Sequence, residues 1–122
     1  MFIVDEETGD IITRQGDSGT LVLNNIDTSK NWKVYFSVYD KNRKQMINEV
    51  FTQSNNLPTV AISISANATD PLKVNSDEEY ATYYYGVKLC ADGIEDTLII
   101  GNGDIDSENT ITVYPKKTEG DT

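Results

Sequence analysis

The sequence contains no histidine, and only one of its 122 residues, Cys90, is a cysteine. Histidine is the usual general base beside a serine or cysteine nucleophile and the commonest nitrogen ligand of zinc. A single cysteine can form neither an intramolecular disulfide nor a thiolate cluster around a metal. These absences remove the largest classes of hydrolase and zinc site, and we expect Cys90 to be buried and unreactive.

The chain also lacks a long apolar segment and an excess of positive charge. No stretch reaches the ~18 to 20 apolar residues that cross a bilayer, and acidic residues 5–7 follow the first four residues, so we expect neither a signal peptide nor a membrane anchor. Ten Lys and Arg stand against twenty Asp and Glu, a net charge of −10. Such a surface repels phosphate backbones and anionic headgroups. We expect no nucleic-acid or membrane partner, although basic residues between 30 and 44 leave a local anion contact open.

Alternation of apolar and polar residues indicates β-strands over residues 32–40 and 80–90. Shorter strands are predicted at 11–13, 20–24, 46–52, 60–64, 97–100 and 111–113, separated by turn signals such as 14–19, 40–43 and 92–93. The inner faces of the two long strands are expected to be buried: Trp32, Val34, Phe36 and Val38 on one, and Tyr83, Tyr85, Val87 and Leu89 on the other.

This succession of short strands predicts an all-β fold, an antiparallel sandwich in preference to a small barrel, with about seven to nine strands. The only predicted helical signal is one turn after Ser76, where acidic residues 77–79 suit the positive end of a helix dipole. We expect one domain, with an N-terminal arm at 1–9, a β-sandwich at 10–115 and a flexible C-terminal tail at 116–122.

Carboxylates are the remaining catalytic material, because a pair of them can serve as acid, base or nucleophile. Twenty acidic residues on a small domain will lie near one another by chance, so we predict no catalytic residues, no enzyme activity and no cofactor.

One acidic segment is a candidate calcium site, because oxygen ligands recur at alternate positions in Asn102, Asp104, Asp106 and Glu108. Counted from Asn102, however, position six is Ser107 in place of glycine and position twelve is Val113 in place of a bidentate glutamate. The favoured interpretation is the outer face of a strand, and no bound metal is predicted.

The tyrosines at 83–85 offer broad apolar area with a polar tip, as in platforms that bind sugars or proteins. Alternation sends Tyr83 and Tyr85 to one face and Tyr84 to the other, so part of this run belongs to the core. Tyr39 and Tyr84 are the candidate interaction residues on the outer faces of their strands.

Three segments together resemble the immunoglobulin-like domain of tailed-phage virion proteins, notably the N-terminal domain of upper baseplate proteins. Residues 12–23 (ITRQGDSGTLVL) are similar to the family's opening strand, Gly-Asp turn and following hydrophobic strand. Residues 83–89 (YYYGVKL) resemble its Tyr-x-Tyr-Asp-Ile-x-Leu strand, with Gly86 in place of Asp. Residues 97–105 (TLIIGNGDI) resemble its Thr-Leu-x-x-Gly-x-Phe-x-Ile hairpin, with Gly103 in place of the aromatic residue.

The resemblance implies an immunoglobulin-like sandwich that is a structural component of a virion, most simply of its tail or baseplate. It implies contacts with other virion proteins or with copies of the same chain, and no catalytic residues. A head-decoration or adaptor protein, or a module that binds carbohydrate on the host surface, is the alternative function.

Overall fold

The computed structural model describes residues 1–103 and 105–118. In this part of the chain, short strands alternate with turns, and one short helix joins two of the strands. The elements in chain order are β1 (Ile3–Val4), β2 (Ile11–Arg14), β3 (Gly19–Leu23), β4 (Lys33–Tyr39), β5 (Val50–Gln53), β6 (Val60–Ile64), α1 (Ala66–Thr69), β7 (Ala81–Ala91), β8 (Ile94–Thr97) and β9 (Asn109–Tyr114).

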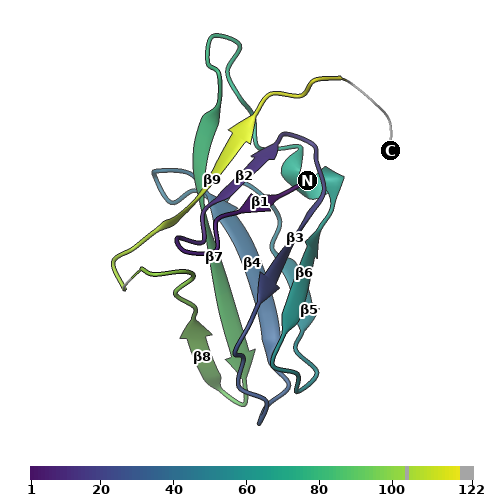
Figure 1. Cartoon of the computed structure of the whole chain (residues 1–122), viewed down its shortest axis with the longest axis vertical. Helices are drawn as coiled ribbons and strands as arrows, with labels where there is room; N and C mark the ends of the chain where they lie inside the picture. The colour runs from purple at the N-terminus through teal and green to yellow at the C-terminus, as the bar shows by residue number, and fades with distance from the viewer. Residues whose placement is uncertain (104, 119–122) are drawn as a thin grey trace.

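The strands form two sheets (Figure 1). The larger sheet has the order β1-β2-β9-β7-β4-β5, and β8 pairs with the C-terminal part of β7. Its pairs are antiparallel except for β2 and β9, which run parallel. β3 and β6 form a separate antiparallel pair. This arrangement confirms the predicted all-β sandwich.

The hydrophobic core lies between the two sheets and confirms the predicted alternation. Every inner side chain of the two long strands is buried, from Val34 to Val38 on β4 and from Tyr83 to Leu89 on β7. The small sheet contributes its own buried residues, Leu21, Leu23, Val60, Ile62 and Ile64, to the same cluster. Removal of this apolar surface from water is the dominant stabilising contribution to such a domain.

A tyrosine of β7 makes a contact that is also typical of immunoglobulin domains. In immunoglobulin domains a tyrosine near the start of the equivalent strand donates a hydrogen bond to the backbone upstream, and the second cysteine of the intersheet disulfide follows two residues later. Here the Tyr83 hydroxyl donates to the Lys73 carbonyl oxygen at 2.5 Å. Tyr85, two residues later, is 1% exposed and donates its hydroxyl proton to the Gly9 carbonyl oxygen.

The buried tyrosines predict a loss of stability in alkaline solution. Burial raises the pKa of Tyr83 and of Tyr85 above the ordinary value of 10.0. The unfolded chain therefore ionises these hydroxyls at a lower pH than the folded protein does, so the free energy of unfolding is intact below pH ~10 and falls as pH rises further. Urea unfolding between pH ~8 and ~11 measures how steeply the free energy of unfolding falls with pH. The fall should be less steep in Tyr85→Phe. An equally steep fall in this variant would show that the Tyr85 hydroxyl is not responsible.

The predicted single turn at Ser76 is present, since the Glu78 N–H donates to the Asn75 carbonyl oxygen at 3.0 Å. Other predicted details are wrong. The helix of the structure is α1, which the sequence analysis missed, and the Ser65 hydroxyl caps it by accepting a hydrogen bond from the Ala68 N–H at 3.2 Å. The strand predicted at 46–52 is β5, which begins only at Val50, and the strand predicted at 97–100 is β8, which ends at Thr97. The predicted N-terminal arm contributes β1 to the large sheet.

Cys90 is half-buried, so its predicted full burial is wrong. It lies on the outer face of β7, and its Sγ is 3.9 Å from a carboxylate oxygen of Glu95, its cross-strand partner on β8. Among the described residues, no helix combines the length and the apolar character needed to span a membrane.

Candidate functional site

Aromatic side chains gather on the outer face of the large sheet, which faces away from the core. Tyr35 and Tyr39 come from β4, Phe51 from β5 and Tyr84 from β7, and we call these four residues the outer aromatic face. Phe51 is 49% exposed and the three tyrosines are half-buried. Aromatic side chains of this kind supply much of the binding energy in protein interfaces.

Strand register brings the four rings together in two pairs. Tyr39 is directly opposite Tyr84 across β4 and β7, and their ring centroids are 5.9 Å apart in a stacked arrangement. Tyr35 is opposite Phe51 across β4 and β5, with centroids 5.4 Å apart. Since each ring is held by its cross-strand partner, the face loses little side-chain entropy when it is covered.

A small hollow separates the two aromatic pairs. Ser37 is opposite Gly86 at the middle of the β4–β7 ladder, so the sheet has almost no side-chain cover at that point. The hollow has a volume of about 150 Å³, with Tyr35 and Tyr39 at its sides and Glu49 among the polar residues around it.

The fold itself does not require glycine at position 86. Its φ is not in the positive region, and a Cβ placed there would meet no heavy atom within 4 Å. Glycine inside a strand costs about 0.5–1 kcal/mol relative to alanine, and often marks a place where a ligand or another backbone approaches closely. The strand could therefore hold a larger side chain at position 86 without a clash.

Charged groups lie near the outer aromatic face. Burial is the main reason why the pKa of Tyr39 lies above 10.0, and the nearby negative charge of Glu108 raises it further. Tyr39 is thus a neutral hydroxyl at physiological pH, able to donate or accept a hydrogen bond. Lys88, at the rim of the hollow, forms an ion pair with Glu95 at 3.2 Å.

The structure brings together the two aromatic residues that the sequence singled out. Tyr39 and Tyr84 were predicted as separate candidates, and here they are half-buried neighbours in one stacked pair. Sequence reasoning missed Tyr35, Phe51 and the hollow at Gly86. Alternation along β4 did place Tyr35 beside Tyr39, but the cross-strand partners depend on a register that the alternation does not reveal.

The calcium candidates do not lie along a strand, so that part of the interpretation is wrong. Asn102 and Asp106 are in turns, Glu108 precedes β9, and Asp104 lies outside the described residues. The Asn102 backbone N–H donates to the Glu7 carbonyl oxygen at 2.7 Å, which ties this loop to the N-terminal segment. In the described ranges no three Cys, Asp or Glu side chains come close enough to hold a metal ion.

Comparison with protein-family models and with curated protein sequences finds no match to this chain. The functional argument therefore depends on the fold, the outer aromatic face and the sequence resemblance to virion domains.

Proposed function

We propose that this protein is a structural component of a tailed-phage virion, most simply of the tail or baseplate, which assembles by covering its outer aromatic face with a neighbouring virion protein. A head-decoration or adaptor role would use the same face. The β-sandwich agrees with the fold implied by the sequence resemblance. Fold alone does not specify function, so the proposal depends on the surface.

The observation that carries the proposal is Gly86 in the middle of the outer aromatic face. A central strand gains stability from side chains that pack on its surface. Here the middle of the β4–β7 ladder has only Ser37 and Gly86, and aromatic residues lie on both sides of it. An interface hot spot has this form, because a partner's side chain enters a small depression and aromatic rings exclude water around it. The sheet around the hollow suits a protein surface better than a small substrate, for which larger concave sites are usual.

The decisive experiment compares Gly86→Val with Ala61→Val in purified particles. Ala61 is an exposed residue of β6 in the other sheet, so its substitution adds similar bulk away from the outer aromatic face. Gly86→Val should keep or raise the melting temperature, because valine favours strands, yet reduce incorporation into particles by about tenfold or more. Quantitative mass spectrometry of gradient-purified particles, with Ala61→Val as control, provides the measurement.

Absence of the wild-type protein from particles would refute the virion assignment itself. Equal incorporation of Gly86→Val and wild type would refute the role of the outer aromatic face. Sedimentation analysis of the isolated protein tests whether a second copy supplies the covering surface, since the resemblance also implies homo-oligomers.

The second candidate is a module that binds host-surface carbohydrate, which the Tyr39 and Tyr84 pair favours because sugar rings stack on aromatic side chains. Tyr84→Ala would then reduce glycan binding and particle adsorption together. If particles incorporate the Tyr84→Ala variant at the normal level and still adsorb to the host as before, this candidate is eliminated.

A further inference from the structure

The outer edge of β3 has no partner strand. β3 pairs with β6 along one edge, and no strand of the described residues pairs with the other. In an immunoglobulin sandwich the strand equivalent to β3 has a further strand beside it in the same sheet. Here the N-terminal strand β1 pairs instead with β2 of the large sheet. Alternate residues of β3 therefore direct their backbone N–H and C=O groups away from β6. The Phe2 ring packs closely against Gly19, so the part of this edge that borders the groove begins at Thr20.

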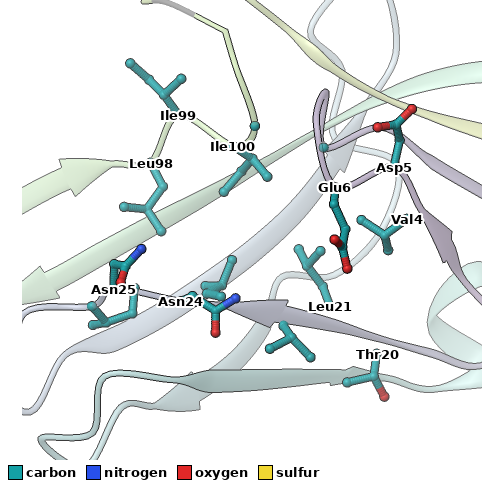
Figure 2. Close-up of a pocket in the computed structure, with 15 residues that line it drawn as sticks. Val4, Asp5, Glu6, Thr20, Leu21, Asn24, Asn25, Leu98, Ile99 and Ile100 are labelled. Carbon is teal, nitrogen blue, oxygen red and sulfur yellow. The ribbon is translucent and has the colours of Figure 1, made fainter.

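This edge forms the base of a groove with a volume of about 800 Å³ (Figure 2). In the close-up, β3 runs below the groove with β6 on its far side, and Leu98, Ile99 and Ile100 lie across from Val4 and Glu6. The groove thus has the open edge of a strand at its base and two separate chain segments as its walls.

Hydrogen bonds hold the two walls to each other. The Asn109 side-chain amide donates to the carbonyl oxygens of Thr8, at 2.9 Å, and Ile100, at 3.1 Å. The Asn102 N–H donates to the Glu7 carbonyl oxygen at 2.7 Å. These contacts join the two walls, so the groove exists before anything binds and requires little ordering of the protein.

The exposed edge of β3 lacks two of the residue types that commonly protect a strand edge. β3 has the sequence GTLVL, without a charged residue or a proline. Leu21, Val22 and Leu23 line the groove; the two leucines are already buried in the core, whereas Val22 is 52% exposed. An extended segment of similar length with alternating apolar residues would add to β3 through backbone hydrogen bonds and would cover Val22.

The charge on the groove has one sign. Asp5 and Glu6 are the charged residues among those that line it. The Asp5 carboxylate is occupied, because it accepts hydrogen bonds from the N–H groups of Glu7 and Thr8. The Glu6 side chain extends into the groove toward Leu21 (Figure 2), and no residue of the described part forms an ion pair with it. A lysine or arginine in the bound segment would neutralise this carboxylate.

We propose that the groove binds an extended strand of another protein, which pairs with the open edge of β3 and places a basic side chain against Glu6. The inference depends on the proposed assembly function only for the source of that strand, a neighbouring protein of the same particle. A second copy of this chain is disfavoured, since it would bring the same negative charge to the groove.

The test uses two synthetic peptides of about nine residues, long enough to span β3 with an overhang at each end. Both alternate valine and threonine; one carries lysine at each end and the other glutamate. Amide hydrogen exchange followed by NMR should show slower exchange at alternate residues of β3 when the lysine peptide is added. The lysine peptide should bind about tenfold more tightly than the glutamate peptide at low salt.

Glu6→Lys should reverse the preference between the two peptides. Glu7→Lys is the matched control, because it makes the same charge change at the next residue, which does not line the groove. Both side chains are exposed, so both variants should fold.

The proposal is overturned if neither peptide protects β3, if protection appears only at another strand edge, or if Glu6→Lys and Glu7→Lys behave alike. Protection of β3 by self-association without peptide would also contradict it. Gly86→Val should leave peptide binding unchanged, so failure of the groove and failure of the outer aromatic face can be distinguished.

Discussion

Replacement of Tyr85 by alanine should unfold a large fraction of the protein at moderate temperature. Tyr85 is 1% exposed, its ring lies 5.5 Å from that of Phe36, and its hydroxyl donates to the Gly9 carbonyl oxygen. Truncation of a large buried aromatic residue costs about 3–5 kcal/mol. Because small domains have about 5–15 kcal/mol of stability in total, this loss consumes a large part of it. Urea unfolding followed by circular dichroism measures the change.

Two further variants separate the ring of Tyr85 from its hydroxyl. Tyr85→Phe keeps the packing and removes the hydrogen bond, which should cost about 1–3 kcal/mol because the Gly9 carbonyl loses this partner in a buried position. Tyr84→Ala, at the adjacent residue on the outer face, should cost less than Tyr85→Ala. Equal losses for Tyr84→Ala and Tyr85→Ala would show that Tyr85 is not the central core residue described here.

Replacement of Gly101 by alanine should cause the second large loss of stability. Gly101 has φ of +77°, and a Cβ at this position would lie 2.4 Å from the Thr8 carbonyl carbon. The contact is with backbone, so relief requires the loop to move away from the N-terminal segment. Strain at positive φ costs about 1–2 kcal/mol, and forced repacking adds about 1–3 kcal/mol.

Gly93→Ala is the control that isolates the clash. Gly93 has φ of +79°, nearly the same backbone conformation, but its added Cβ would meet nothing within 4 Å. Gly93→Ala should therefore lower the free energy of unfolding only by the cost of positive φ in alanine, about 1–2 kcal/mol. If Gly93→Ala and Gly101→Ala lower the melting temperature equally, the contact between Gly101 and Thr8 contributes nothing beyond backbone strain.

Strand identity could be predicted where alternation was long enough to define two faces. The residues predicted to be buried on the two long strands all belong to the core. The turn at 92–93 was also predictable, because Asp92 and Gly93 both adopt positive φ, 51° and 79°, as a tight hairpin between β7 and β8 demands. These features depend on local sequence alone.

Short elements were harder to predict because tertiary contacts decide them. Helix α1 is only four residues long, so its helix propensity is too weak to stand out from the strand pattern before it. The Thr69 hydroxyl donates to the Asp17 carbonyl oxygen at 2.8 Å, which attaches the helix to a turn far away in the sequence. Such a contact leaves no local signature.

The sequence by itself determined that this protein is an acidic all-β domain without histidine, and it determined which face of each long strand is buried, because side-chain alternation has a period of two. Only the tertiary structure decided the rest. It paired Tyr39 with Tyr84 and Ser37 with Gly86, and it directed β1 to β2, which left the edge of β3 open. Register and strand partners depend on contacts between residues distant in the chain, and the alternation along one strand carries no information about them.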